Sequence, residues 1–451
     1  MAAKSRQYTA SFPSKSLVNM PVCLAMVGLP ARGKTFIARK LARYLNWIGI
    51  ETKVFSSGNY RRDLYKTQCT HKFFDPDNPE GIAIREHCAK LAMNDIAIWL
   101  NGKGQVAIFD STNGTRKRRE KVIQFCKQNS FKLLFIESFC DDPSIVHSNI
   151  MEVKVTSPDY KNVSPEQACE DFKARIKLYE TQYEPLCLTK DDQVRFLKVV
   201  NTGRRFVVNR AEGYVESKVA YYTMNIHVVS RSIYLTRHGE SEFNLKGRIG
   251  GDSDLSPHGQ KFAEVLGEFV NKQNLENLKV WTSQLKRTSQ SAQHIKASAE
   301  QWKALNELDA GVCDGMTYEE IQEKYPEDFA RRDQDKFHYR YKRGESYEDI
   351  VIRLEPVIME LERQQNVLVI CHQAIMRCLL AYFLEVKKEE LPYLAVPLHT
   401  VFKLTPVAYG CKVEKFPLGI EAVNTQRERP KNVQVGRKPE DALVTVPPHV
   451  M

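Results

Sequence analysis

The stretch PVCLAMVGLPARGKTFIARKLARYL, residues 21–45, decides the fold of the first half of the chain. It opens with an apolar run, residues 21–27, that has the length of a buried strand. A glycine-containing loop follows, and apolar residues then recur at helical spacing from Phe36 to Leu45. Strand, glycine loop and helix in this order predict the start of a parallel α/β sheet.

The loop between that strand and helix fits the pattern GxxxxGK[ST]. Glycines let successive backbone N–H groups point inward around an anion, and the following helix adds its positive N-terminus. The lysine can reach the β- and γ-phosphates of a nucleotide, and the last hydroxyl can ligate Mg²⁺. A glycine turn with a solvated lysine is the alternative, and the flanking strand and helix argue against it. The predicted phosphate cradle comprises Gly28, Leu29, Pro30, Ala31, Arg32, Gly33, Lys34 and Thr35.

A carboxylate downstream supports this interpretation. Asp110 ends the apolar run 106–110, and folds with such a loop place a carboxylate beside Mg²⁺ at a strand end. Taken alone, an Asp in this place is more often a turn or helix-cap residue. Together with the loop, it predicts that Thr35 and Asp110 hold Mg²⁺ and that the first half binds a nucleoside triphosphate.

Strand-like and helical segments alternate along the first half. Apolar runs of strand length lie at 53–55, 106–110, 132–139 and 194–200, and helical periodicity covers 84–100 and 166–179. This alternation predicts a doubly wound parallel sheet.

A second pattern begins near residue 231. A short apolar run, 232–236, opens into Arg237-His238-Gly239-Glu240, and further strand candidates lie at 280–282 and 367–371 with helical stretches between them. This predicts a second α/β domain. We expect a flexible arm at 1–20, a first domain at 21–230, a second at 231–422, and a polar, Pro-rich tail at 423–451 that lies on the surface or is partly disordered.

Two histidines at predicted strand ends form a second group of candidate site residues. His238 and His372 each follow an apolar run, and carboxyl ends of parallel strands meet at one edge of a sheet. A neutral imidazole can attack phosphorus, and Arg237 and Arg287 can supply the positive cage that a transferring phosphoryl group needs. The leaving oxygen also needs a proton donor. Spacing leaves three candidates for this role, Glu240, Glu307 and Asp309.

Length and composition exclude several classes of protein. The 451 residues are 42% hydrophobic and 27% charged, which excludes a mainly disordered chain. No apolar run approaches the roughly 18 residues of a membrane helix, and residues 1–20 lack a signal-peptide core. The eleven cysteines include no CxxC pair, so neither a zinc site nor a disulfide framework is expected. We therefore expect a cytoplasmic protein with no membrane partner.

The net charge of +11 belongs entirely to the first half, since residues 1–230 carry +12 and residues 231–451 carry −1. Such an excess suits either nucleic acid or small phosphorylated ligands. The basic side chains are dispersed, and the only dense run is Arg116–Arg119, so we expect no nucleic-acid partner. Candidates for holding a phosphorylated acceptor, if they are not simply solvated surface charges, are Arg61, Arg85, Arg118, Lys154 and Arg175.

The two groups of residues, in this order in one chain, resemble the bifunctional 6-phosphofructo-2-kinase/fructose-2,6-bisphosphatase family. The resemblance runs from about Pro21 to the region of Val446. Segments that carry it include VGLPARGKT (27–35), YRRD (60–63), FIESFCDDP (135–143), RHGESEFNLKGRIGGD (237–252), KVWTSQLKRT (279–288), LNELDAGVC (305–313) and VLVICHQAIMRCLLAYFL (367–384).

The resemblance implies an adenylate-kinase-like P-loop kinase half followed by a histidine phosphatase half of the phosphoglycerate mutase-like type. The implied kinase uses ATP and Mg²⁺ to phosphorylate the 2-hydroxyl of fructose 6-phosphate. The implied phosphatase hydrolyses fructose 2,6-bisphosphate through a phosphohistidine, so the enzyme sets the level of a regulator of glycolysis and gluconeogenesis. A homodimer is also implied.

The resemblance further assigns roles by position. In the kinase half, Asp110, Cys140 and Lys154 match kinase-site positions, and the segment Asn149–Lys154 matches a nucleotide contact. Matches to the fructose 6-phosphate contacts are Arg61, Arg85, Thr112, Arg118, Arg175 and Tyr179.

In the phosphatase half, His238 matches the histidine that becomes phosphorylated, and Glu307 matches the proton donor, which the spacing left open. The phosphoryl cage matches Arg237, Asn244, Arg287 and His372. The predicted contacts of the sugar bisphosphate are Gly250, Tyr318, Arg332, Lys336, Tyr347, Gln373 and Arg377.

The chain departs from the usual family pattern in three places. FDSTNGTRKRR stands where FDATNTTRERR is usual, and Gly114 is expected to loosen a loop beside the sugar site. GVCDGMTYEE stands where GVCEEMTYEE is usual, so Gly315 replaces a glutamate near the phosphatase site. Asp254, Pro257 and His258 differ from the usual family pattern GDSGLSxRG. These changes bear on relative rates. The alternatives are a nucleic-acid end-processing kinase/phosphatase and a lopsided enzyme with one degenerate half.

Overall fold

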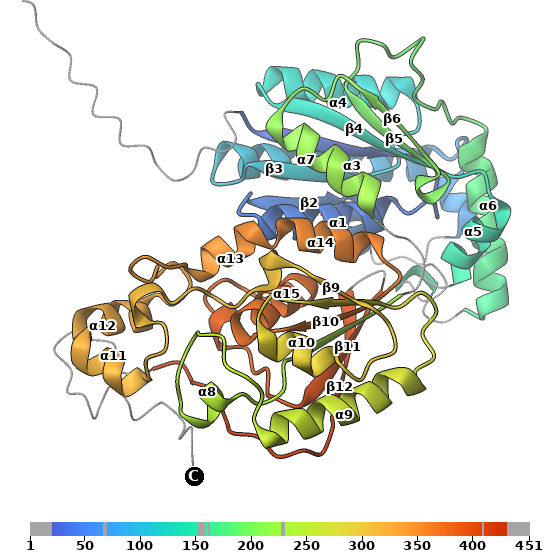
Figure 1. Cartoon of the computed structure of the whole chain (residues 1–451). Coiled ribbons are helices and arrows are strands. Elements are labelled where there is room, and N and C mark those ends of the chain that lie inside the picture. The colour runs from blue at the N-terminus through green and yellow to red at the C-terminus, as the bar shows by residue number, and fades with distance from the viewer. Residues whose placement is uncertain are drawn as a thin grey trace, which may run out of the picture. The chain divides into compact units, whose positions relative to one another are not determined.

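The computed structural model of the chain describes residues 20–65, 70–151, 158–160, 163–226, 231–407 and 410–430. The chain divides into two compact units, Met1–Ile226 and His227–Met451. Within the described residues, each unit is built on one six-stranded sheet with helices on its faces (Figure 1).

The first sheet has the strand order β2-β3-β1-β4-β5-β6. Neighbouring strands from β2 to β5 run parallel, and β6 pairs antiparallel with β5 at the edge. The strands are β1 (Val22–Val27), β2 (Thr52–Ser56), β3 (Val106–Asp110), β4 (Lys132–Phe139), β5 (Phe196–Val200) and β6 (Arg205–Asn209).

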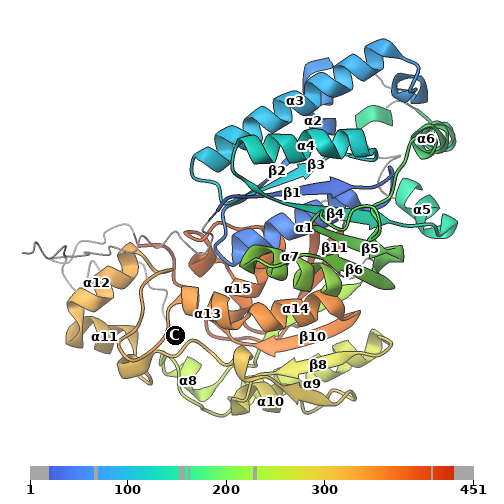
Figure 2. The ribbon, with the colours of Figure 1, turned by 90° about the horizontal axis from the view of Figure 1, so that it is seen from above.

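Helices cover both faces of this sheet. Figure 2 shows α3 and α4 over one face and α1 and α7 over the other. The helices are α1 (Lys34–Trp47), α2 (Ser57–Tyr65), α3 (Pro79–Asn101), α4 (Arg116–Gln128), α5 (Pro143–Asn149), α6 (Pro165–Glu180) and α7 (Tyr214–Asn225).

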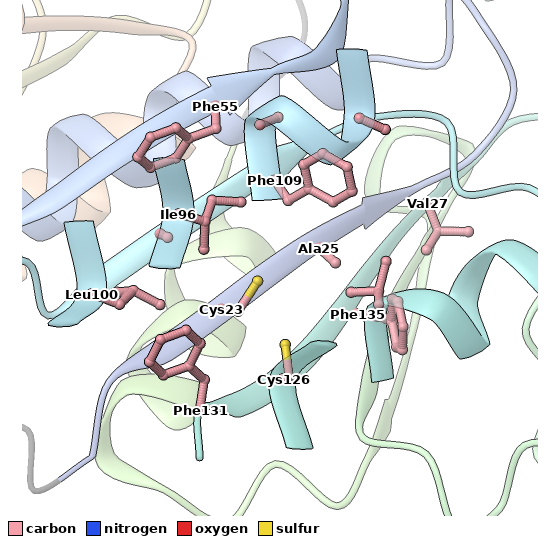
Figure 3. Close-up of a cluster of buried hydrophobic side chains, with 14 of the residues drawn as sticks. Cys23, Ala25, Val27, Phe55, Ile96, Leu100, Phe109, Cys126, Phe131 and Phe135 are labelled. Carbon is pink, nitrogen blue, oxygen red and sulfur yellow. The ribbon is translucent and has the colours of Figure 1, made fainter. Parts of the chain in front are cut away.

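One large core cluster of the first unit lies between the sheet and the helices α3 and α4. Cys23, Ala25 and Val27 alternate along β1, so their side chains share one face of the sheet (Figure 3). Phe109 and Phe135 belong to the same cluster and are almost fully buried. Burial of each phenylalanine contributes about 1.5–3 kcal/mol, which holds the strand ends that carry the first site in place.

Short polar residues start the helices that follow the strands. The Thr115 side chain accepts a hydrogen bond from Arg118 N at the start of α4. Ser164 accepts from Gln167 N at the start of α6, where Pro165 follows the cap. These bonds satisfy backbone N–H groups that a first helical turn leaves unpaired.

The second sheet has the order β12-β11-β7-β10-β8-β9. The strands from β7 to β9 in this order run parallel, whereas β11 pairs antiparallel with both β7 and β12. The strands are β7 (Ser232–Arg237), β8 (Lys279–Thr282), β9 (Ala299–Gln301), β10 (Asn366–Cys371), β11 (Thr400–Val407) and β12 (Gly410–Pro417).

Helices again pack on both faces of the second sheet. Phe262 and Leu266 of α9 and Ala292 of α10 form a core with Leu368 and Ile370 of the central strand β10. The helices are α8 (Glu242–Leu245), α9 (Pro257–Lys272), α10 (Lys286–Ala292), α11 (Tyr318–Lys324), α12 (Pro326–Gln334), α13 (Tyr347–Arg353), α14 (Glu355–Arg363) and α15 (Gln373–Leu384).

The predicted α/β class is confirmed, with two differences in detail. The antiparallel edge strands β6, β11 and β12 were not predicted. In the described part of the predicted tail, residues 423–430, Arg427 is 1% exposed and its guanidinium is paired with Asp333, so this part does not simply lie on the surface. Among the described residues, no helix combines the length and the apolar character needed to cross a bilayer.

Candidate active sites

The glycine loop lies between β1 and α1, and its backbone requires glycine at two positions. Gly28 has φ +136°, and a Cβ there would lie 2.4 Å from the carbonyl oxygen of Ser138. Gly33 has φ +82°, and Ala31 between them also adopts a positive φ of 58°. A run of left-handed conformations turns backbone N–H groups into a concave nest, which is suited to phosphate.

Thr35 and Asp110 meet at the mouth of this loop. The Thr35 Oγ1 donates to Asp110 Oδ2 over 2.8 Å, because β3 ends beside β1 in the parallel sheet. The Lys34 Nζ donates to the carbonyl oxygen of Leu29 over 2.7 Å and so folds over the loop. A hydroxyl oxygen and a carboxylate oxygen at this distance suit the donor set of Mg²⁺.

Two further residues predicted for the kinase half contact the loop: Asn149, predicted to bind the nucleotide, and Cys140, predicted at a kinase-site position. Asn149 Nδ2 donates to Ala31 O over 3.1 Å, and Arg32 Nε donates to Cys140 O over 2.7 Å. Burial raises the pKa of the Cys140 thiol, so it is a neutral thiol rather than a thiolate. Lys154 lies outside the described residues.

Four of the six residues predicted to bind fructose 6-phosphate lie around one aromatic ring, that of Phe74. The guanidinium carbon of Arg175 lies 3.5 Å from the centroid of the Phe74 ring, and those of Arg61 and Arg85 lie 5.6 and 6.0 Å from it. The ring of Tyr179 is 6.1 Å from the same ring. Phe74 is 4% exposed, so its π-face serves as a buried platform for three cations.

Arg118 belongs to the same region. The pKa of Arg118 is lowered, mainly because the side chain is buried. Glu86 and Tyr179 oppose this shift, and Arg85 adds to it with the smallest of these effects.

Thr112 and Gly114 lie on the loop after β3. The Thr112 carbonyl accepts from Gly28 N over 3.0 Å, which ties this loop to the glycine loop. The Gly114 carbonyl accepts from Glu184 N over 2.8 Å and from Arg119 Nη1 over 3.3 Å. These bonds tie the loop down and argue against the expected loosening at Gly114. A Cβ there would lie 3.1 Å from the Tyr183 ring, so glycine makes room for that ring.

In the second unit, His238 and His372 lie side by side at the ends of β7 and β10. Arg237 and Cys371 are register partners in the parallel pair, and the two imidazole rings are 5.1 Å apart. His238 Nδ1 lies 2.7 Å from Gly239 O. Because a carbonyl only accepts, Nδ1 carries the proton and Nε2 keeps its lone pair.

Both imidazoles are held neutral. Burial, with Arg287 and Arg237 close by, keeps the pKa of His238 well below its usual range. Burial and the same cations, together with His238 and Arg353, do the same for the pKa of His372. Burial also lowers the pKa of Arg237, to about 10, so that guanidinium stays charged at neutral pH.

Of the three carboxylates left open by spacing, Glu307 lines the same cavity as His238. Its Oε1 accepts from Leu308 N over 2.8 Å and from Ala374 N over 3.3 Å, which fixes the carboxylate in place. Glu240 is instead bonded to Ser256 Oγ and Val423 N, and Asp309 Oδ1 accepts from Gly311 N. The cavity therefore favours Glu307 as the acid.

The cavity contains about 980 Å³ of empty space, part of it open to solvent. It reaches from the histidine to a cationic and aromatic end. Tyr341 Oη accepts from Arg332 Nε over 2.7 Å, and Tyr347 Oη accepts from Arg377 Nη1 over 3.1 Å. Of the residues predicted in this half, those that line it are Arg237, His238, Asn244, Gly250, Arg287, Glu307, Tyr318, Arg332, Lys336, Tyr347 and Gln373.

Several cationic side chains lie close together at the end of the cavity around Lys336. Burial, with Arg332, Arg377 and Arg427 nearby, holds the pKa of Lys336 well below its usual range. Asp333 pairs with Arg332 and Arg427, so part of this positive charge is balanced within the protein, and Lys336 is left with the smaller effect of that carboxylate.

Gly250 lines the cavity, whereas Gly315 is not among its lining residues. Gly250 has φ +69°, and a Cβ there would lie 1.7 Å from Asp314 Oδ1. Gly315 has φ +77°, and no atom lies within 4 Å of the place where a Cβ would be. A side chain would therefore fit there, and the left-handed backbone conformation is what favours glycine.

Three residues of the second site were not predicted. Ser283 Oγ lies 2.8 Å from His372 Nε2, His399 Nε2 accepts from Glu240 N over 2.9 Å, and Thr425 Oγ1 accepts from Arg237 Nη1 over 2.7 Å. A serine after a strand and a threonine in a polar segment carry no local signal, and only the fold brings them to the site.

The chain matches known families over both units. Residues 10–230 match the family model described as 6-phosphofructo-2-kinase, and residues 233–418 match that of the histidine phosphatase superfamily, branch 1.

Relatives that match nearly the whole chain carry both activities in their names. The 6-phosphofructo-2-kinase/fructose-2,6-bisphosphatase 4 of Rattus norvegicus is 58% identical over 434 residues, which cover 96% of this chain and 92% of that protein. The 6-phosphofructo-2-kinase/fructose-2,6-bisphosphatase 1 of Homo sapiens is 57% identical over 445 residues, which cover 98% and 94%. The chain belongs to the bifunctional 6-phosphofructo-2-kinase/fructose-2,6-bisphosphatase family.

Proposed function

We propose that the chain catalyses two opposed reactions at its two sites. The first unit transfers the γ-phosphoryl group of ATP to the 2-hydroxyl of fructose 6-phosphate. The second unit hydrolyses fructose 2,6-bisphosphate to fructose 6-phosphate and phosphate. Membership of the family supports both activities, and the two residue groups described above supply the chemistry.

In the kinase half, the loop Gly28–Thr35 binds the nucleotide phosphates, and Lys34 neutralises charge on the transferring group. Mg²⁺ would be held by Thr35 and Asp110, where it would offset the negative charge between the phosphates. The arginines around Phe74 hold the sugar phosphate, so that the 2-hydroxyl lies in line with the γ-phosphorus. The contact between Thr35 and Asp110 is the observation that carries this half.

In the phosphatase half, the Nε2 lone pair of His238 attacks the phosphorus of the 2-phosphoryl group. Arg237 and Arg287 stabilise the charge that spreads over its oxygens, and Glu307 donates a proton to the leaving 2-oxygen. Water then attacks the phosphohistidine, and Glu307 takes back a proton. The observation that carries this half is the fixed Nδ1–H of His238 in a cavity lined by both arginines and Glu307.

We further infer a homodimer in the cytoplasm. The edge strand β6 supports the dimer, because within the described residues it pairs only with β5 and leaves one row of backbone groups open. Val208 on this strand is 45% exposed. We propose small phosphorylated molecules, rather than nucleic acid, as the ligands of both sites, although Arg61 and Arg332 also pair with Asp159 and Asp333 of the protein.

Two variants separate the reactions. Lys34→Met should abolish synthesis of the bisphosphate and leave its hydrolysis intact, and His238→Ala should do the reverse. Each variant serves as the folding control for the other. If Lys34→Met still made the bisphosphate, the proposed nucleotide site would be wrong, and if His238→Ala still hydrolysed it, the phosphohistidine route would be wrong.

A further inference from the structure

Ser283 lies directly after β8 and contacts one of the two histidines. Its Oγ is 2.8 Å from His372 Nε2, and both residues are 0% exposed. The same Oγ accepts from Leu285 N over 3.1 Å and lies 2.9 Å from Thr288 Oγ1. The hydroxyl is therefore held in one place with its proton directed to one of two neighbours.

The other ring nitrogen of His372 has no such contact. Nδ1 is buried, and none of the described residues forms a hydrogen bond with it. The ring lies 5.1 Å from that of His238, and Arg237 and Arg287 are close enough to affect its titration. A buried polar atom without a hydrogen bond costs free energy, so we expect a group bound during the reaction to form a hydrogen bond with Nδ1.

Two arrangements of the protons give the hydroxyls of Ser283 and Thr288 a hydrogen-bond acceptor each. In the first, Ser283 donates to His372 Nε2 and accepts from Thr288, so the imidazole proton is on Nδ1. In the second, His372 Nε2–H donates to Ser283, Ser283 donates to Thr288 Oγ1, and Thr288 donates to Leu285 O over 2.8 Å. The second arrangement leaves a lone pair on Nδ1.

The ligand chemistry selects the first arrangement. A phosphoryl group offers only hydrogen-bond acceptors, so a lone pair on Nδ1 would repel it and an N–H would bind it. Because His372 is neutral, it has a single proton, and that proton is on Nδ1 only when another group donates to Nε2.

We propose that Ser283 is a positioning residue of the phosphatase site: its hydroxyl donates to His372 Nε2 and thereby keeps the imidazole proton on Nδ1, which donates to the phosphoryl group during its transfer to His238. This inference rests on the proposed phosphatase function. It adds to that function a residue that touches neither substrate nor nucleophile.

The kinetic test compares full-length variants in the hydrolysis of fructose 2,6-bisphosphate. Ser283→Ala should lower kcat about tenfold to a hundredfold, because it leaves Nε2 buried without a partner, and should change KM little. Ser283→Thr keeps the hydroxyl and should recover most of kcat. Kinase activity of the same preparations monitors the first unit.

Thr282→Val is the matched control. Thr282 precedes Ser283, is equally buried, and its Oγ1 pairs with no atom of the described residues. Its replacement should leave kcat near the wild-type value. An equal loss in Thr282→Val and Ser283→Ala, or an unchanged kcat in Ser283→Ala, would overturn the proposal.

The spectroscopic test reads the tautomer directly. The full chain is labelled with ¹⁵N-histidine and saturated with inorganic phosphate, and His372→Gln identifies the resonances of His372. We expect protonated Nδ1 and unprotonated Nε2 in the wild type, and a mixture of tautomers in Ser283→Ala. The same tautomer in both proteins would refute the role of Ser283, whereas a wild type that fails to hydrolyse the bisphosphate would refute the proposed function instead.

Discussion

At the scale of single residues, proton positions decide the chemistry of the second unit. The bond from His238 Nδ1 to Gly239 O leaves Nε2 as the nucleophile, and burial among arginines keeps both histidines neutral. Their low pKa values also make the stability of the folded protein depend on pH, because these imidazoles bind a proton more readily in the unfolded state than in the folded state.

The unfolding free energy of the second unit should therefore fall as the pH drops below about 6.5. The native pKa values of His238 and His372 are depressed, so the unfolded state binds more protons in that range and stability rises with pH until about 6.5. Each histidine contributes up to about 1.4 kcal/mol per pH unit. Denaturant titrations followed by loss of phosphatase activity measure the slope.

The control for this prediction is His372→Asn, followed by tryptophan fluorescence together with the wild type. Its stability should depend less steeply on pH below 6.5. Parallel slopes for the two proteins would show that the histidines are not responsible.

Gly315→Glu tests a departure from the usual family residue. The left-handed backbone at φ +77° costs a non-glycine residue about 1–2 kcal/mol, while the space around it is open. We expect a loss of stability of this size, measured by urea unfolding, with hydrolysis still present. A more stable variant would mean that the loop can adopt another conformation.

At the scale of elements, one aromatic side chain, Phe74, brings together arginines of the first site. Phe74 ends the short 3₁₀ helix His71–Phe74 and contacts arginines from α2, α3 and α6. α2 and α3 lie on either side of Phe74 in the sequence, α6 lies far beyond them, and all three supply an arginine to the ring.

Phe74→Leu should therefore raise the KM for fructose 6-phosphate about threefold to thirtyfold, since loss of the cation–π contacts costs of the order of 0.5–2 kcal/mol. The KM for ATP should change little. Phe74→Tyr keeps the π-face and is the matched control. Steady-state kinetics with each substrate varied in turn would contradict this account if both variants behaved alike.

The elements also show what a sequence can predict. The buried strands β1, β3, β4 and β10 were located because they are continuous apolar runs. The edge strand β6 and the polar strand β9 were missed, because half-exposed or polar strands lack that signal. The glycine loop and the strand-end histidines have local patterns, whereas Ser283 and Arg427 reach their places only through tertiary contacts.

At the scale of the whole molecule, the open edge of the first sheet bears on assembly. Val208→Lys should weaken a dimer formed through β6, because it places a charge on the strand that would pair. Sedimentation of the wild type and the variant measures the effect. A Lys variant that stays dimeric would move the interface elsewhere, and Val407→Lys, an exposed position on β11, is the control.

The whole chain makes and destroys the same product, so its net effect depends on the ratio of two rates. The most direct test of this account is a time course with γ-labelled ATP, fructose 6-phosphate and Mg²⁺. Label should first accumulate in fructose 2,6-bisphosphate and later appear as inorganic phosphate, at rates that Lys34→Met and His238→Ala abolish separately. If no labelled bisphosphate forms, or if label reaches phosphate without passing through it, the central claim of two opposed activities is contradicted.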